Sequence, residues 1–249
     1  MNVITIKNVS KNYKDKKALD NVCLEIKKGE LFGLLGVNGA GKTTLIKILC
    51  TLTKKSGGTV FVDGFDLDKE ADKIKEIVDI SPQETSVANN LTVKENLQFI
   101  AGVYQKNASE KVREIVELFR LEEVLNQRAK TLSGGYKRRL SIAIALVSEP
   151  KILFLDEPTL GLDVFARREL WTIIRRLKEK VTIVLTSHYL EEMENLCDRV
   201  AILSKGKVLN VGTVEEIKVA ASCATFEDAF MKLVGAYEQG IKVRGSENA

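Results

Sequence analysis

The sequence has no apolar run of membrane-spanning length. Its longest apolar stretches, residues 31–37 and 140–147, are short and interrupted, whereas a bilayer span needs about 20 predominantly apolar residues. Residues 1–17 are polar almost throughout and lack the apolar centre of a secretion signal. These absences predict a protein that has no spans of its own and stays in the cytoplasm.

Cysteine and histidine are also scarce. The four cysteines lie far apart without a CxxC pair, and His188 is the single histidine. This spacing is typical neither of a zinc site nor of a disulfide framework, and one histidine excludes a polyhistidine metal site. We expect buried thiols in a reducing compartment.

The charge balance is mild, with a formal net charge of +4 and a pI near 8.7. Two basic clusters, residues 14–17 and 137–139, leave open a contact with nucleic acid or anionic lipid. The alternative is a solvated lysine face, which we favour for the first cluster.

Apolar segments of strand length alternate with helix-like segments, which is typical of an α/β sheet. The apolar segments 3–9, 22–26 and 31–35 predict the first strands. Residues 86–148 differ, because they predict three helices and little strand. A Thr92–Glu95 capping box predicts the first helix, Val93–Tyr104, and Ser109 and Ser133 are the predicted caps of the other two.

The stretch "GVNGAGKT", residues 36–43, fits the phosphate-loop pattern G-x-x-x-x-G-K-[ST]. An apolar strand precedes it, and the sequence predicts that a helix starts at Lys42. Glycines let successive backbone amides converge on phosphate oxygens, and the helix N-terminus adds partial positive charge. Lys42 is expected to reach the β- and γ-phosphates, and the Thr43 hydroxyl to bind Mg²⁺.

A second apolar strand, in "KILFLDEP" (residues 151–158), ends in two carboxylates. One interpretation is a buried strand with polar residues at its exit. In a phosphate-loop protein, such a strand delivers Asp156 to the Mg²⁺ shell and leaves Glu157 to orient and polarise the attacking water. The pair therefore predicts hydrolysis of the nucleotide and not binding alone.

Further motifs select among phosphate-loop families. The chain has no N-K-x-D element of a GTPase, and residues 86–125 hold only two unclustered arginines, unlike the arginine-rich lid of a small kinase. The stretch "LSGGYKRRL", residues 132–140, resembles the signature of ABC-transporter ATPases. Over residues 1–235 the other elements follow in that family's order: Tyr13, the phosphate loop, Gln83, the signature, the Asp–Glu strand, "GLD" (161–163) and His188.

This resemblance implies an α/β fold with an ABC-type P-loop NTPase core sheet, an N-terminal antiparallel β subdomain and a helical subdomain insert at about 86–148. It implies Mg-ATP as ligand and a role for each motif residue. Tyr13 stacks on adenine, the alternative being a tyrosine packed on the core. Gln83 reaches Mg²⁺ or the attacking water, and His188 contacts the γ-phosphate.

The resemblance also implies a second ATPase domain, because the signature of one domain meets the γ-phosphate held by another. The implied catalytic residues are Glu157, His188 and Gln83, and the implied metal ligands are Thr43, Gln83 and Asp156. The residues implied to contact nucleotide are Tyr13, Gly36, Asn38, Gly39, Ala40, Gly41, Lys42, Thr43, Thr44, Ser133, Gly134, Gly135 and Asp163.

Tyr136 in the signature, and the tail "ATFEDAFMKLVG" at 224–235, resemble the branch of drug, antibiotic, polysaccharide and lipid exporters. The implied partner is an integral membrane permease that holds the ATPase, as a homodimer or with a paralogue, at the cytoplasmic face of the membrane. No nucleic acid is expected. An importer ATPase, a non-transport ABC ATPase and an ATP-binding regulator without turnover are the alternatives. Residues 1–235 are the expected domain and 236–249 a flexible tail.

Overall fold

The computed structural model describes residues 1–14, 16–104 and 108–239. These residues form two compact units. The first consists of residues 1–76 together with the chain from Thr182 onward, and the second of residues 77–181. Each unit carries part of the motif set, and each is described in turn.

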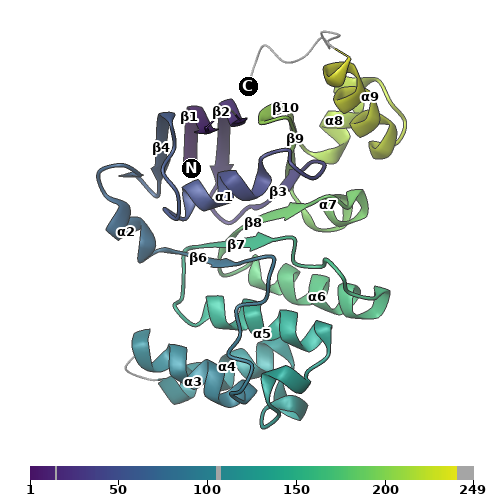
Figure 1. Cartoon of the computed structure of the whole chain (residues 1–249). Coiled ribbons are helices and arrows are strands. Elements are labelled where there is room, and N and C mark those ends of the chain that lie inside the picture. Colours follow the sequence, from purple (N-terminus) through teal and green to yellow (C-terminus); the bar gives the residue numbers. More distant parts are fainter. Residues whose placement is uncertain (15, 105–107, 240–249) are drawn as a thin grey trace. The chain divides into compact units, whose positions relative to one another are not determined.

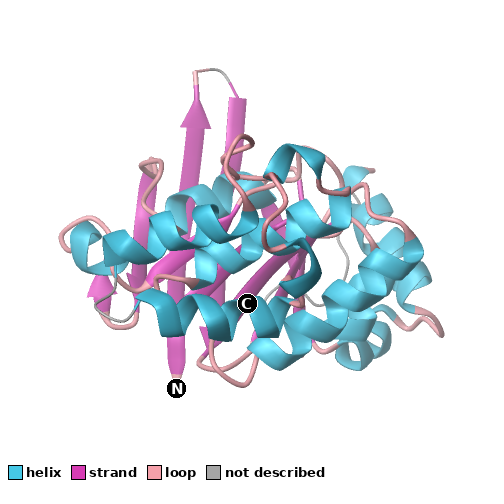
Figure 2. Ribbon diagram, turned by 90° about the horizontal axis from the view of Figure 1, so that it is seen from below, coloured by secondary structure: helices cyan, strands magenta, loops and turns pink. Residues whose placement is uncertain are grey.

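An antiparallel sheet in the first unit has the strand order β2-β1-β4-β5. Its strands are β1 (Asn2–Tyr13), β2 (Lys16–Lys27), β4 (Gly57–Val62) and β5 (Phe65–Asp66). Figure 2 shows the long β1 and β2 side by side. Ile4 and Ile6 are buried while Lys7 is exposed, the alternation expected of a sheet with one covered face. The strands predicted at 3–9 and 22–26 are confirmed as β1 and β2, and both extend further than predicted.

Parallel strands form the second layer of this unit. β3 (Leu31–Leu35) pairs in parallel with β8 (Thr182–Ser187) and β9 (Arg199–Ser204), and β10 (Lys207–Gly212) runs antiparallel to β9. Every residue of β3 and β8 is buried. Continuous burial is expected of parallel strands, because both faces of such a sheet are covered.

Helices connect and flank these strands (Figure 1). They are α1 (Lys42–Leu49), α2 (Ala71–Lys75), α7 (Leu190–Leu196), α8 (Val214–Ala221) and α9 (Phe226–Glu238). α9 ends beyond the predicted domain boundary at residue 235. Residues 240–249 of the predicted tail lie outside the described residues.

The second unit combines two parallel strands with a group of helices. The strands are β6 (Val78–Ser81) and β7 (Ile152–Asp156). The helices are α3 (Val93–Tyr104), α4 (Ala108–Phe119), α5 (Gly134–Leu146) and α6 (Val164–Leu177), with short 3₁₀ turns at Glu122–Val124 and Ala129–Thr131. Figure 1 shows α3, α4 and α5 grouped together.

The cap predictions for these helices have different outcomes. The Thr92 hydroxyl accepts a hydrogen bond from the Glu95 amide at 3.1 Å, and the Glu95 carboxylate accepts one from the Thr92 amide at 2.7 Å, which confirms the capping box. Ser133 is confirmed as the cap of α5. The prediction for Ser109 is wrong, because α4 already includes Ala108. Within the described residues, no helix has both the length and the apolarity to cross a membrane.

Candidate functional site

The phosphate-loop motif joins a buried strand to a helix in the first unit. β3 leads into residues 36–41, and α1 begins at Lys42. Gly39 and Gly41 have φ angles of 82° and 109°, in the left-handed region that residues with a Cβ rarely adopt. The backbone conformation of the loop therefore requires glycine at both positions.

Gly36 is required for a different reason, which is close packing. A Cβ on Gly36 would lie 2.4 Å from the backbone oxygen of Leu203 in β9 and 2.9 Å from the Cβ of Ala40. The loop thus begins in direct contact with the neighbouring strand, and its starting position is set by the parallel sheet.

The Lys42 side chain lies inside the loop. It is 5% exposed, and its Nζ donates hydrogen bonds to the Gly36 oxygen at 2.6 Å and the Val37 oxygen at 3.5 Å. The N-cap of α1 is Gly41, which offers the first amides no side-chain acceptor. This short segment thus combines a cation with the amides of a helix N-terminus, and both favour the binding of an anion. The loop residues therefore fit a phosphate group.

The other motif residues differ in exposure. Asn38 is exposed, Ala40 is buried, and Thr43 and Thr44 are half-buried. The Ala40 oxygen accepts a hydrogen bond from the Gly206 amide at 2.9 Å, which ties the loop to the turn between β9 and β10.

Two further predicted residues belong to the first unit. Tyr13 ends β1 with 45% of its surface exposed, and the Lys11 Nζ lies 4.7 Å from its ring centroid. The alternative that Tyr13 packs into the core is therefore wrong. His188 directly follows β8, is half-buried, and has its ring centroid 4.2 Å from that of Tyr189.

The two acids lie at the end of β7 in the second unit. Asp156 is 3% exposed and Glu157 is 6% exposed. Glu157 has a φ angle of 50°, a left-handed conformation that costs a residue with a side chain about 1–2 kcal/mol. Strain of this kind persists where the surrounding structure imposes it, and it gathers at functional positions.

Gln83 and Asp163 lie in loops of the same unit. Gln83 is exposed, two residues beyond β6. Asp163 is the N-cap of α6, and its Oδ1 accepts hydrogen bonds from the amides of Phe165 at 2.9 Å and Ala166 at 3.0 Å. This cap is not among the sequence predictions, although an aspartate directly before a helical segment is its usual signal.

The signature begins at an exposed helix N-terminus. Ser133 caps α5 by accepting a hydrogen bond from the Tyr136 amide at 3.4 Å. Ser133 and Gly134 are exposed. A Cβ on Gly135 would approach the Cβ of Ala166 in α6 to 3.2 Å, so the start of α5 packs against the start of α6. The structure thus brings the signature beside the "GLD" turn.

The second basic cluster is mostly buried. Arg138 and Arg139 are 5% and 6% exposed. Arg138 donates to the backbone oxygens of Pro82 and Gln83, and Arg139 forms an ion pair with Glu169 of α6. These partners argue against the contact with nucleic acid or anionic lipid that the sequence left open for this cluster, because both arginines are bound to other residues of the chain.

Arg138 interacts with several predicted site elements of the second unit. It lies on the signature helix, and it binds the main chain at Gln83. Burial lowers the pKa of its guanidinium, and the charge of Asp156 acts in the opposite direction. Arg138 is not among the site residues predicted from the sequence.

Metal-binding side chains are sparse in the described part of the chain. It holds no group of three or more His, Cys, Asp or Glu residues arranged to bind a metal ion. A Mg²⁺ ion here would draw ligands from hydroxyl and amide oxygens, from single carboxylates, and from nucleotide phosphates, which suits its preference for oxygen.

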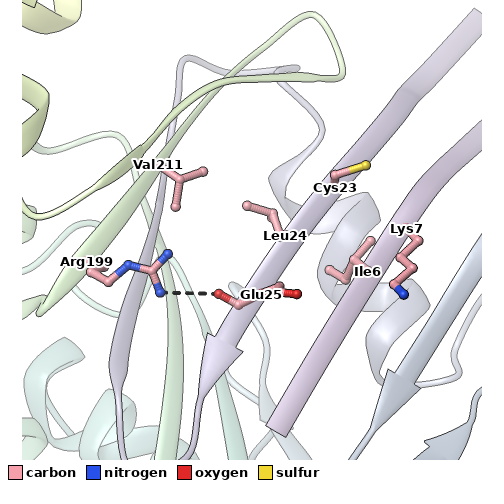
Figure 3. Close-up of a pocket in the computed structure, with 7 residues that line it drawn as sticks. All are labelled: Ile6, Lys7, Cys23, Leu24, Glu25, Arg199 and Val211. Atoms are coloured by element: carbon pink, nitrogen blue, oxygen red, sulfur yellow. Dashed lines mark hydrogen bonds between the residues drawn. The ribbon is translucent and has the colours of Figure 1, made fainter. Parts of the chain in front are cut away.

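A pocket of about 410 Å³ opens in the first unit (Figure 3). It is lined by Ile6, Lys7, Cys23, Leu24, Glu25, Arg199 and Val211. The Arg199 guanidinium donates to the Glu25 backbone oxygen at 3.3 Å and to the Glu30 carboxylate at 3.1 Å. The pocket contains no predicted site residue, so it is separate from the phosphate loop.

Comparison with known proteins identifies the family. Residues 19–160, more than half of the chain, match the profile described as ABC transporter. This chain belongs to the ABC transporter family. ATP-binding domains of the ABC family bind ATP or ADP and are ATPases, which confirms at family level the expectation of an ATPase. Such domains dimerise and work with a membrane permease.

Two curated relatives have related descriptions. The chain is 38% identical over 246 residues to the Probable multidrug ABC transporter ATP-binding protein YbhF of Escherichia coli (strain K12), covering 95% of this chain and 42% of YbhF. It is 37% identical over 219 residues to the Linearmycin resistance ATP-binding protein LnrL of Bacillus subtilis (strain 168), covering 86% of this chain and 70% of LnrL. The chain therefore spans less than half the length of YbhF.

A solved ABC structure supports the fold. The ATP-binding cassette MJ0796, in a dimeric post-hydrolysis state bound to ADP and Pi, superposes with a TM-score of 0.76 at 27% identity, covering 84% of this chain and 98% of MJ0796. The predicted fold class is confirmed: an ABC-type α/β fold with an antiparallel β part, a parallel P-loop sheet and a helical part.

Proposed function

We propose that this chain binds and hydrolyses Mg-ATP as the ATP-binding subunit of an ABC transporter and drives export by a separate membrane permease. The observation that carries the proposal is the buried Lys42 ammonium inside a glycine loop at the N-terminus of α1. The signature and the Asp–Glu strand, in the order of the ABC family, add the chemistry of hydrolysis.

Binding roles follow from the motif that each residue occupies. Lys42 and the loop amides bind phosphate oxygens, and Tyr13 offers an exposed ring for adenine. Thr43, Gln83 and Asp156 supply oxygen ligands for Mg²⁺, which when bound neutralises phosphate charge. The buried lysine and glycine loop make the first of these roles the one that the geometry supports most directly.

Glu157 is the proposed general base, which orients water and takes its proton on the carboxylate. Its burial keeps the carboxylate out of bulk water. His188 is the proposed polar contact of the γ-phosphate. Gln83, exposed in its loop, assists at the metal or the water.

A second ATPase subunit, identical or a paralogue, completes the proposed cycle. The exposed Ser133 and Gly134, with Gly135, present hydroxyl and amide donors to the γ-phosphate of the other subunit, and Asp163 lies in the turn beside them. Shifting a pair from 1:99 to 99:1 closed needs about 5.5 kcal/mol. Hydrogen bonds to charged groups contribute about 1.5–3 kcal/mol each, so two sites with two or three such contacts suffice. ADP lacks these oxygens, and the pair reopens.

The permease would hold the protein at the cytoplasmic face of the membrane. Phe99 and Val103, one helical turn apart on α3, are each 67% exposed, and Tyr104 is 61% exposed. An apolar strip of this kind suits a protein partner. Export is favoured because YbhF and LnrL are described by multidrug transport and linearmycin resistance. Residues 1–235, with the helical part at about 86–148, are the proposed ATPase domain.

The test is ATP turnover by the purified protein and by its Glu157→Gln variant. The substitution keeps the shape of the side chain and removes the base, which typically contributes about 10²- to 10⁴-fold. We expect that loss in kcat, unchanged ATP binding, and an ATP-dependent dimer in size-exclusion chromatography. Glu123→Gln, at an exposed carboxylate in a 3₁₀ turn, is the matched control and should keep wild-type turnover.

Different failures carry different meanings. A wild-type protein that binds no ATP refutes the function itself. Wild-type turnover by Glu157→Gln refutes the base assignment, and a variant that stays monomeric with ATP counts against the shared site. Co-purification with a co-expressed membrane protein encoded by a neighbouring gene tests the proposed permease partner. If cells with that partner accumulate the transported solute, the transporter is an importer and not an exporter.

A further inference from the structure

The signature helix is joined to the end of β6 by polar contacts along one of its faces. Arg138 donates from NH1 to the Pro82 oxygen at 2.8 Å and from NH2 to the Gln83 oxygen at 2.5 Å. One turn further along α5, the buried hydroxyls of Ser141 and Ser81 lie 3.0 Å apart. The helix that begins with the signature is therefore fastened to the loop that carries Gln83.

The Arg138 contact fixes orientation as well as distance. A guanidinium is a planar fork, and here its two terminal nitrogens hold the carbonyls of two consecutive residues. Hydrogen bonds from a charged donor are about twice as strong as those between neutral groups. Two such bonds restrain the direction of both peptide groups and hence the direction in which the Gln83 side chain leaves the backbone.

Burial makes this arrangement costly for a purely structural contact. Arg138 is 5% exposed, and apolar residues of similar volume often replace buried charges without loss of stability. The charge of Asp156 partly compensates for the burial of the guanidinium. The cation thus holds the backbone of one proposed Mg²⁺ ligand, Gln83.

We propose that Arg138 is a positioning residue for Gln83: anchored on the signature helix, it holds the Gln83 main chain so that the amide side chain is directed for ATP hydrolysis. This inference rests on the proposed function. It makes Arg138 a link between the residues that meet a second subunit and the residue that serves the metal or the attacking water.

A double-mutant cycle tests this link. The proteins are the full-length wild type, Arg138→Gln, Arg138→Lys, Gln83→Ala and the double variant Arg138→Gln with Gln83→Ala. Lysine keeps the charge but has one nitrogen, so it cannot reproduce the planar two-point contact. Arg113→Gln, at an exposed arginine on α4, is the control. The readouts are kcat, the Kd for ATP, the Mg²⁺ dependence of turnover, and circular dichroism.

We expect Arg138→Gln to lower kcat at least about tenfold and to raise the Mg²⁺ concentration needed for half-maximal turnover, while the Kd for ATP stays within about twofold. Arg138→Lys should recover part of the loss. In the Gln83→Ala background, Arg138→Gln should cost less than about twofold more, because residues that act as a unit are not additive. Arg113→Gln should match the wild type.

Three results would overturn the inference. One is wild-type kcat in both Arg138 variants. Another is a double variant whose loss equals the product of the single losses. The third is loss of the circular dichroism signal in both Arg138 variants, which would assign Arg138 to folding instead of to Gln83. A wild type without ATP turnover would instead refute the proposed function.

Discussion

Replacing Gly36 by alanine tests whether β9 sets the position of the phosphate loop. The new Cβ would lie 2.4 Å from the Leu203 oxygen, whereas a carbon–oxygen contact is normally about 3.3 Å or longer, so one of the two must move by about 0.9 Å. Both atoms are tied to the backbone, and no flexible side chain can absorb the shift.

The energetic cost combines two opposing effects. Overpacking costs about 1–3 kcal/mol. Gly36 does not have a left-handed φ angle, so alanine adds no backbone strain there, and replacing glycine stabilises by about 0.4–1 kcal/mol through the unfolded chain. We expect a net loss of about 1–2 kcal/mol. For a protein of about 150–250 residues this lowers Tm by about 2–8 °C.

Nucleotide affinity should fall as well, because a shift of Gly36 displaces Lys42, which is bonded to the Gly36 oxygen, and the loop amides that are the proposed phosphate donors. Loss of one charged hydrogen bond from these donors to a phosphate oxygen, about 1.5–3 kcal/mol, corresponds to a Kd for ATP at least about tenfold higher. Thermal unfolding and titration with ATP measure the two effects.

The matched control is Gly57→Ala in β4, whose added Cβ meets no atom within 4 Å and whose φ angle is not left-handed. This variant should keep the wild-type Tm within about a degree or exceed it, since only the unfolded chain is affected. A Gly36→Ala protein with wild-type Tm and ATP affinity would refute the claim that contact with β9 positions the loop.

Two further predictions concern single contacts. Burial raises the pKa of Asp79 above its ordinary value of 3.8, even though Ser148 donates a hydrogen bond to its carboxylate. The folded protein therefore binds this proton more tightly than the unfolded chain does. As a result, the stability of the wild type falls as pH rises from 3.8 through the raised pKa. Asp79→Asn should therefore gain stability relative to wild type over that rise in urea unfolding at stepped pH, and a constant difference would contradict the sign. Thr213→Ala removes the acceptor of the 3.1 Å hydrogen bond from the Glu216 amide and should lower the free energy of unfolding by about 1 kcal/mol in the same assay. Thr213→Ser keeps a hydroxyl and should cost far less. Equal losses of stability in the two variants would show that the hydroxyl cap contributes nothing.

The sequence predicted elements well where one local signal decides them. The strand at 31–35, the helix start at Lys42 and the helix Val93–Tyr104 agree with the structure residue for residue. A buried apolar run, a glycine loop and a capping box each act over a few neighbouring residues, so no tertiary contact is needed to recognise them.

Predictions that depended on distant partners failed or were missed. The arginines at positions 138 and 139 indicated a charged surface. In the structure both are buried, because Arg138 binds the backbone at positions 82 and 83 and Arg139 pairs with Glu169. The short helix Ala71–Lys75 was not predicted, because five residues hold too few turns for a helical period to appear. The types of the candidate site residues could be predicted from sequence motifs, whereas the left-handed φ angle of Glu157 could not, because no local pattern of residues indicates it.

The Lys42 ammonium bonded to the Gly36 oxygen also has a kinetic consequence. This bond and the positive φ angles of Gly39 and Gly41 define the curvature of the loop through contacts and conformations of the chain itself. We expect nucleotide capture to require little ordering of the segment, and such preorganisation lowers the entropic cost of association. Differences between the triphosphate and the diphosphate should then appear mainly as residence time, with similar rates of arrival.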